Sequence, residues 1–165
     1  PIVIAGLAGQ QRLADYYIQV HLFFLKGEKG SELDNSVRQQ EIYDQMDAST
    51  PFVERYFQKS YIDYTKKQER VTPQFQNLLA RLRQKYGSTD HIPVEVRQEF
   101  LRSSRPVITW NGLLTFNFRE FWLFLFCLID VPVCNFLFEI FVMGLLYCYV
   151  NHRHEAFCKR IASQL

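Results

Sequence analysis

The hydrophobic and polar positions divide the chain into a polar front and an apolar back. From Phe121 to Val150 the sequence is apolar over thirty residues, and its strongly polar interruptions are Asp130, Asn135 and Glu139. A helix of that length would measure about 45 Å, whereas a bilayer core about 30 Å thick needs about 20 helical residues. The run is too long for one upright crossing, so we expect it to fold back on itself.

The fold-back point is predicted at Asp130 and Pro132. Proline lacks a backbone donor and its ring clashes with the preceding helical turn, and an aspartate prefers water. Together they predict a corner between two helices at a membrane surface. Val133–Val150 is then the second crossing, and the first must begin near Val107. This gives a two-helix transmembrane hairpin over residues 107–150.

The hairpin places Arg119 and Glu120 near the middle of the membrane, where a charge costs about 2.5–3.5 kcal/mol on insertion scales. The alternative is a short first helix that lies in the interface, with Arg119 among the lipid headgroups. Charged groups inside a membrane are candidates for function by default.

Polar residues in the two halves of the hairpin are spaced so that each set shares one helix face. Asn111, Thr115 and Arg119 follow each other at intervals of four, and Asn135 and Glu139 repeat that interval in the next helix. Two polar stripes on neighbouring helices predict a wet, polar cavity inside the bundle.

Residues 1–25 are predicted to form one membrane or interfacial helix. The start is small and apolar, with Ala5 and Gly9 at a spacing that suits close helix packing in a membrane. It has neither the basic flank nor the cleavage site of a signal peptide, and we interpret the chain as a C-terminal piece of a longer protein. The helix then becomes amphipathic and should end at the glycines after Lys26. Its apolar positions with helical spacing are Leu13, Tyr16, Tyr17, Val20 and Phe24.

Residues 31–104 are charged and rich in glutamine, and we interpret them as a helical cytoplasmic insert. The whole chain is therefore expected to be all-α, an integral membrane helical bundle fragment with this insert. Four helices are predicted in the insert from capping residues and prolines. They begin near Asp34–Ser36, at Ser49 or Thr50 before Pro51, at Thr72 before Pro73 with a stop at Gly87, and within residues 92–105.

The second helix of the insert carries an aromatic stripe. Such a stripe can bind bases or sugars, but it is more often buried packing, which is the interpretation we adopt. The basic run Arg81–Lys85 is interpreted as a solvated helix face rather than a phosphate contact. The stripe consists of Phe52, Tyr56, Phe57, Tyr61 and Tyr64.

The net charge of +2 is too small to indicate a nucleic-acid partner. The four cysteines lack the CxxC spacing of a zinc site, and we interpret them as reduced, packed thiols. His152, His154 and Cys158 suggest a metal, but a convincing third ligand is missing beside the pair His154 and Cys158, which are four apart. Residues 151–165 are therefore interpreted as a basic cytoplasmic tail without a metal.

Basic residues flank both ends of the predicted hairpin and are absent from its corner. Arg102 and Arg105 precede it, and Arg153, Lys159 and Arg160 follow it. Because loops rich in lysine and arginine stay on the cytoplasmic side, the insert and the C-terminus are both expected there.

Four separated blocks, LADYYIQVHLFFLKGEKGSELDNS, LTFNFRE, FLFEI and NHRHEAFCKR, occur in this order and draw on nearly the whole chain. They resemble the C-terminal half of the bacterial CDP-alcohol phosphatidyltransferase family, in particular a Bacteroidetes-type branch with a cytoplasmic insert between two late membrane helices. The resemblance implies a multi-pass enzyme of the cell inner membrane, often homodimeric. Such enzymes move a phosphatidyl or phosphoalcohol group from a CDP-linked donor to an alcohol and release CMP in phospholipid biosynthesis.

The aspartates of the family's signature hold Mg²⁺ or Mn²⁺ against the diphosphate. That signature is absent, because the chain contains no Asp-Gly pair. We therefore expect the metal ligands to lie outside this chain, no catalytic residue within it, and no transferase activity from the fragment alone. Charge and position, not a family motif, make Arg12 and Arg119 candidates for contacting the substrate phosphate or the acceptor alcohol.

Two other classes of protein stay open at this point. One is a membrane-anchored helical adaptor, whose insert over residues 31–104 binds a cytoplasmic partner through the aromatic stripe. The other is a soluble all-helical domain that buries residues 107–150 as its core.

Overall fold

The computed structural model describes residues 2–27, 30–47, 50–87 and 91–165, and within these ranges the chain is helical and has no strand. The all-α prediction is confirmed. A 3-10 segment, η3 (Gly112–Leu114), and a π-helical segment, η4 (Phe138–Met143), join some of the helices. The α-helices are α1 (Ile2–Lys26), α2 (Ser36–Asp44), α3 (Phe52–Val71), α4 (Pro73–Tyr86), α5 (Val94–Asn111), α6 (Phe116–Leu128), α7 (Pro132–Leu137) and α8 (Gly144–Gln164).

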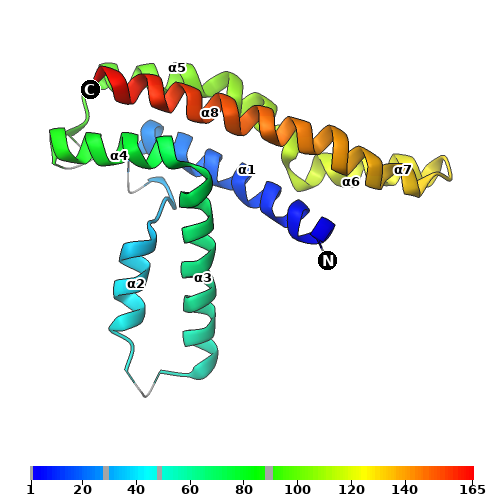
Figure 1. Ribbon diagram of the computed structural model, residues 1–165, viewed down its shortest axis with the longest axis horizontal. Helices are drawn as coiled ribbons and strands as arrows, with labels where there is room; N and C mark the ends of the chain where they lie inside the picture. Colours follow the sequence, from blue (N-terminus) through cyan, green and yellow to red (C-terminus); the bar gives the residue numbers. More distant parts are fainter. Residues whose placement is uncertain (1, 28–29, 48–49, 88–90) are drawn as a thin grey trace.

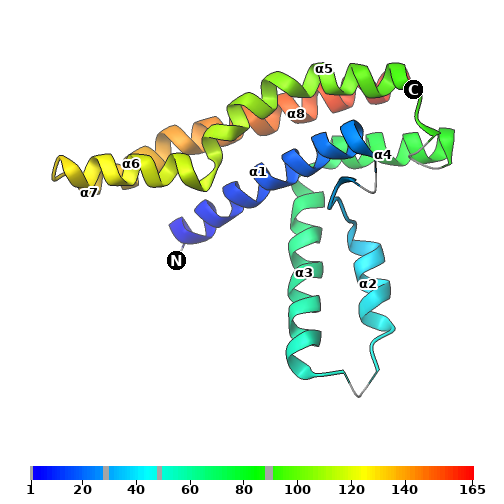
Figure 2. The same ribbon diagram turned by 180° about the vertical axis from the view of Figure 1, so that it is seen from behind.

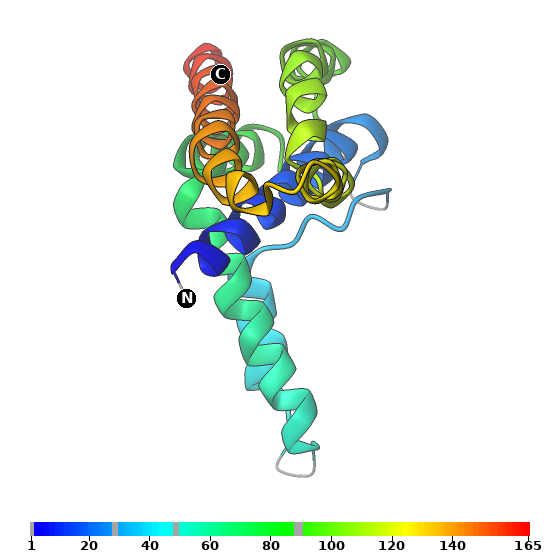
Figure 3. The ribbon, with the colours of Figure 1, turned by 90° about the vertical axis from the view of Figure 1, so that its right-hand side faces the viewer.

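The molecule consists of a long body and one projecting arm. In the body α5 and α8 run side by side along the long axis, α4 packs on α8, and α1 packs on α5 (Figure 1). The view from behind (Figure 2) shows α6 and α7 at the end of the body remote from the C-terminus. The end-on view (Figure 3) shows α2 and α3 leaving the body together. We call these two helices the arm.

The hydrophobic core lies between α1, α4, α5 and α8. Tyr17 and Phe24 of α1, Phe75 of α4 and Phe100 of α5 are fully buried, and the rings of Phe24 and Phe100 stack with centroids 3.7 Å apart. Burying one large apolar side chain stabilises the fold by about 1.5–3 kcal/mol. All five apolar positions predicted on the first helix are buried in this core, so its amphipathic pattern is confirmed.

The core divides the block predicted as one insert over residues 31–104. Its last two helices, α4 and α5, share the core with α1 and α8, and only the arm stands apart from the body. The predicted break between residues 104 and 107 falls inside α5, which continues through Pro106. Pro106 is exposed, while Phe100, Ser104 and Val107 are buried on the opposite side of the helix. Packing on one face thus maintains the helix where proline would otherwise break it.

Several predicted helix ends agree with the structure. α1 ends at Lys26, and Gly27 has φ 82. α4 begins at Pro73 and ends before Gly87, whose φ of 72 suits a residue without a side chain. α2 begins where predicted, and Asn35 Oδ1 accepts from Arg38 N at 2.8 Å.

Two predicted N-terminal caps differ from the structure. Thr72 stands at the N-cap of α4, but its hydroxyl donates to Gln68 O at 2.8 Å and so closes the end of α3 instead. For α3 the flanking residue is Pro51, and neither it nor Thr50 provides a side-chain cap within the part of the chain that the structure describes. The other predicted cap, Ser49, lies outside the described residues.

The interpretation of the aromatic stripe as buried packing is wrong for most of its members. Phe52 is 80% exposed, Phe57 is 66% exposed and Tyr56 is 60% exposed, all on α3. The residues of α3 that are buried are instead Ile62, Thr65 and Gln68. Among the described residues, neither the arm nor the body covers Phe52, Tyr56 and Phe57.

The corner predicted at Asp130 and Pro132 is present. α6 ends at Leu128, Asp130 adopts a left-handed φ of 58, and Pro132 occupies the first turn of the next helix. Val131 N donates to Phe126 O at 2.9 Å, which closes the end of α6. We refer to residues 129–131 as the corner.

The two sides of the corner differ in length. From Pro132 to Gln164 the chain forms 33 continuous helical residues, and by length and composition this is the single candidate membrane span among the described residues. Its most apolar window has a mean hydropathy of 1.9 and is only 22% buried. The first crossing, predicted as one helix from Val107, is interrupted by η3 and by the extended Thr115. α6 itself has 13 residues, about 20 Å, which is shorter than a bilayer core.

Candidate functional site

Arg119 lies in the first turn of α6 and is 5% exposed. All three nitrogens of its guanidinium group donate hydrogen bonds. Nη1 donates to Glu139 Oε2 at 2.5 Å, Nη2 to Gln10 Oε1 at 2.5 Å, and Nε to Leu114 O at 3.2 Å. Arg119 thereby ties α6 to η4 and to α1.

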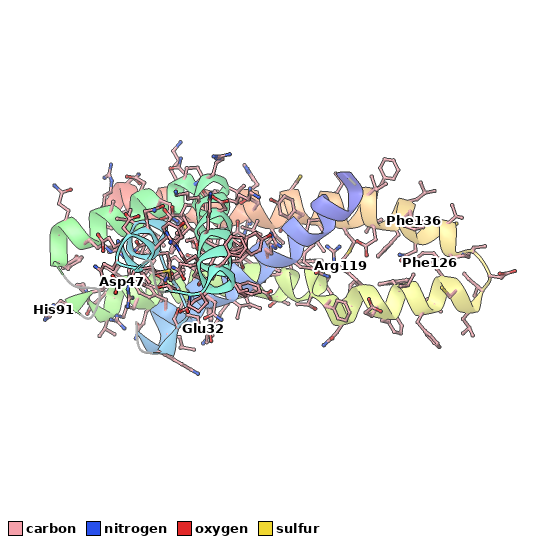
Figure 4. All side chains as sticks on the ribbon, turned by 90° about the horizontal axis from the view of Figure 1, so that it is seen from below. Glu32, Asp47, His91, Arg119, Phe126 and Phe136 are labelled. Atoms are coloured by element: carbon pink, nitrogen blue, oxygen red, sulfur yellow. The ribbon has the colours of Figure 1, made fainter. Side chains whose placement is uncertain are left out.

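Local backbone irregularities build this arrangement. The break after η3 frees the carbonyl of Leu114 from the helical ladder, so that it can accept from Arg119. Glu139, which is 5% exposed, stands in η4, where a π-helical turn shifts the residues that face the neighbouring helix. In Figure 4, Arg119 lies between α6 and α1, and Phe126 and Phe136 lie beyond it toward the corner.

The two predicted polar stripes meet through Arg119 and Glu139. Arg119 and Glu139 are buried against each other, so their charges are compensated by direct contact. Asn111 is fully buried and donates to Ala14 O at 2.8 Å. The Thr115 hydroxyl donates to the nearby Gly112 O at 2.6 Å. The backbone break at η3 removes Thr115 from the helix face of Arg119. The expectation of one straight face over 111–119 is therefore corrected.

Arg12, the second candidate, faces a different part of the molecule. It is exposed, and its guanidinium lies 5.3 Å from the centroid of the Tyr64 ring. It lines an open groove with residues of α3, including Asp63 and Lys67. Gln10 and Arg12 are two residues apart, which is about 200° around a helix. Gln10 faces Arg119. Arg12 therefore points to the opposite side of α1, away from Arg119.

A second pocket between α1 and the arm has an acidic character. It has a volume of about 350 Å³, and its lining includes Asp15, Glu32 and Asp34 together with Tyr61 and Tyr64. Partial burial raises the pKa of the Asp15 carboxyl. Clustered carboxylates repel phosphate groups, so this pocket is unsuited to an anionic substrate.

Basic residues gather where α5 and α8 meet. Arg160 Nη2 donates to Ser103 Oγ at 2.8 Å, and Arg153 and Arg160 line a groove with Pro106 and Phe157. Both arginines are exposed. Their charges face solvent on the C-terminal half of α8, where phosphate groups can reach them.

The C-terminal segment, predicted as a basic tail, is part of α8 and buries one face of that helix. His154, Phe157, Cys158, Ile161 and Ala162 of α8 are all buried. Their spacing is that of a helix with one apolar face. This periodicity is present in the sequence, but the charged residues between them make the segment look polar as a whole.

His154 occupies the centre of this face. Its ring stacks on Tyr17 with centroids 4.0 Å apart, and Phe75 and Phe157 approach its edges. Burial lowers the pKa of His154 and raises the pKa of the Cys158 thiol. The imidazole is therefore neutral within the core at neutral pH.

Glu155 is a residue that the sequence reasoning missed. Its Oε2 accepts from Gln74 N at 2.6 Å, so it caps the start of α4 from another helix. Its Oε1 lies 3.6 Å from His154 Nδ1. Its position between His154 and Cys158 in the sequence gave no sign of either contact.

Comparisons with protein-family models, with curated proteins and with solved structures find no match to this chain.

Proposed function

We propose that this chain is the C-terminal part of a membrane transferase in phospholipid biosynthesis. The enzyme moves a phosphatidyl or phosphoalcohol group from a CDP-linked donor to an alcohol and releases CMP. The proposal rests on the family resemblance of the sequence blocks and on one structural observation. That observation is a buried ion pair, Arg119 with Glu139, inside an end of the molecule whose outer surface is apolar.

The apolar outer surface supports membrane insertion over a soluble core. The side chains around α6, α7 and η4 point outward and are 47–72% exposed, which would be unfavourable in water over a surface of this size. They are Phe121, Phe124, Leu128, Val133, Phe136, Leu137, Ile140, Phe141, Val142 and Leu145.

The ion pair fits the same topology. Along their helices Arg119 and Glu139 are 11 and 9 residues from Asp130, about 17 and 14 Å. With the corner at one membrane surface, both groups lie near the same depth in the middle of the bilayer, where each satisfies the other. The first crossing is then a broken helix made of the end of α5, η3 and α6. Broken helices occur within membranes where protein covers the freed backbone groups.

Under this proposal the two candidate arginines have different roles. Arg12 is exposed and able to contact a substrate phosphate or the acceptor alcohol. Arg119 has its three nitrogens engaged and acts as a positioning residue that fixes α1 against α6 and η4. The exposed basic groove of Arg153 and Arg160 supports a cytoplasmic position for this end of the body.

The divalent cation of the family does not fit the described residues. Mg²⁺ takes hard oxygen ligands such as clustered carboxylates. The potential ligand group found among the described residues contains a thiol and an imidazole beside one carboxylate. Under this proposal the ligands of the reaction's Mg²⁺ or Mn²⁺ lie outside this chain.

Activity of the intact protein tests the transferase proposal. In membranes supplied with a CDP-linked lipid and candidate alcohols, the intact protein should release CMP. Arg12→Ala should lower kcat/KM by about tenfold or more, since a hydrogen bond to a charged group is worth about 1.5–3 kcal/mol. Arg38→Ala, which changes an exposed arginine on the arm, is the matched control. Failure to release CMP with any alcohol, together with no aspartate signature upstream of Pro1, would remove the proposal.

Labelling tests the topology separately. Val131→Cys, in a variant whose native cysteines are serine, should react with a membrane-impermeant maleimide only from outside the cell. His152→Cys in the same cysteine-free background should react only after the membrane has been permeabilised, which admits the maleimide to the cytoplasmic side. Reaction of both residues from one side contradicts the hairpin.

A specific observation favours a second function, that of a membrane-anchored adaptor. The arm exposes the apolar side chains of Phe52, Tyr56 and Phe57 on the first turns of α3. Figure 3 shows that α3 begins at the end of the arm remote from the body. Such a surface suits a cytoplasmic protein partner. The intact protein should then capture a partner that the double variant Phe52→Ser, Phe57→Ser loses, and the transferase activity of that variant should be unchanged.

A further inference from the structure

Three potential metal ligands converge at the junction of α8 and α4. Cys158 Sγ lies 3.8 Å from His154 Nδ1, which lies 3.6 Å from Glu155 Oε1. The three atoms all lie within 4.8 Å of one another. We propose that His154, Glu155 and Cys158 form a binding site for a divalent cation of the zinc type.

The separations suit zinc. Bonds of about 2.0–2.3 Å to nitrogen, oxygen and sulfur place the ligand atoms of a tetrahedral zinc about 3.3–3.6 Å apart. The two separations from His154 Nδ1 lie within a few tenths of an ångström of this range. All three atoms lie within 4.8 Å of one another, so rotation of the Glu155 side chain is needed to close the site. The combination of a thiolate, an imidazole and a carboxylate selects zinc or a similar borderline metal over Mg²⁺ or Ca²⁺.

The ligand groups are poorly satisfied without a cation. Among the described residues, Glu155 Oε1 and His154 Nε2 are buried and have no hydrogen-bond partner. His154 and Cys158 are 2% and 0% exposed. An unpaired buried polar group costs about 1–3 kcal/mol, and a cation would remove that cost for Glu155 Oε1.

Charge and protonation also agree with a dication. The thiolate and the Glu155 carboxylate together balance two positive charges, and the histidine binds in its neutral form. Because the ligand is the thiolate, binding at Cys158 releases a proton. The Glu155 side chain is 14% exposed, so the site lies close to the surface of the body.

The site would join two parts of the chain that lie far apart in sequence. One oxygen of Glu155 binds the cation, while the other accepts from Gln74 N at the start of α4. Three protein ligands leave a fourth position for water. The cation would therefore hold α4 on α8 and increase the stability of the body.

Cobalt(II) reports directly on the thiolate. The test uses the 165-residue chain with Cys127, Cys134 and Cys148 changed to serine, because these three cysteines are exposed and Cys158 is buried. In detergent, this protein should bind one equivalent of cobalt and show a thiolate-to-cobalt charge-transfer band. Zinc should displace the cobalt and raise the Tm.

Two conservative variants and one control locate the site. Cys158→Ser should lose the band, and Glu155→Gln should weaken binding at least tenfold while keeping an acceptor for Gln74 N. His152→Ala, which changes an exposed residue of the same helix, should bind as the parent does. The absence of a band in the folded parent, or an equal band in Cys158→Ser, would overturn the site. The parent measurement decides the matter even if a variant does not fold.

Discussion

Arg119 and Glu139 lie twenty positions apart and form a buried ion pair of 2.5 Å across the corner. They meet because both stand at similar helical distances from Asp130, on opposite sides of the turn. The guanidinium also donates to Gln10, so one side chain holds three separate segments of the chain. The pair links the two helical segments on either side of the corner, and through Gln10 it also links them to α1 in the body.

Breaking this pair should destabilise the protein strongly. Glu139→Ala leaves the buried Arg119 charge without its partner, which costs about 3–5 kcal/mol. The double variant Arg119→Met, Glu139→Leu removes both charges and should recover most of that loss. Unfolding of the detergent-solubilised chain by heat or denaturant gives the comparison. Equal stability of Glu139→Ala and the parent would contradict the structural role assigned to Arg119.

Stability should fall below pH 6.5 because of His154. Burial lowers the pKa of the folded imidazole from its ordinary value of 6.5. The unfolded state therefore binds more protons as the pH falls through this value, and the free energy of unfolding decreases. Above pH 6.5 the contribution of His154 to the free energy of unfolding is fully present.

His154→Phe keeps a ring in the stack on Tyr17 and cannot titrate. With a chelator present to exclude metal effects, its stability should depend less on pH between 7 and 5 than that of the parent. His21, whose pKa burial also lowers, remains in both proteins and serves as the common background. Parallel pH profiles for the two proteins would rule out this role of His154.

The start of α2 should depend on Glu69. Its carboxylate accepts from Ser36 N at 2.8 Å and from Ser36 Oγ at 2.5 Å. Glu69→Ala should cost about 1 kcal/mol, the usual effect of losing a helix cap. Amide hydrogen exchange should show faster opening of α2, while the amides of α4 serve as the internal reference. Unchanged protection of α2 would mean that Asn35 alone caps the helix.

The two faces of α3 should respond oppositely to substitution. Phe57→Ser changes a side chain that is 66% exposed and should alter stability by less than about 0.5 kcal/mol. Ile62→Ala removes a side chain that is 3% exposed and should cost about 2–5 kcal/mol. Denaturant titration separates the two results. A large loss from Phe57→Ser would restore the packing interpretation of the stripe.

Local sequence signals predicted the positions of several turns. Thr72–Pro73, Gly87 and Asp130–Pro132 each mark a change of direction, because proline and glycine restrict or extend the backbone within one or two residues. The boundary predicted between residues 104 and 107 is wrong for the opposite reason, since α5 continues through Pro106. There the packing of α5 on α1 and α8 overrides the local preference of a single residue.

The candidate site was predictable only in part. The four-residue spacing placed Arg119 and Glu139 on two facing polar stripes, but it did not predict their ion pair. The role of Gln10 was not visible, since it lies more than a hundred positions from Arg119. The same holds for Glu155, whose contact with Gln74 spans 81 positions.

The sequence by itself determined the all-helical class, the corner at Asp130–Pro132 and the apolar face of α1, since each depends on neighbours within a few turns of one helix. Only the tertiary structure decided that the stripe of α3 is exposed, that α8 buries His154, and that Arg119 is enclosed. These outcomes depend on which distant segments of the chain cover a given helix face. The residues of that face alone do not determine which segments these are.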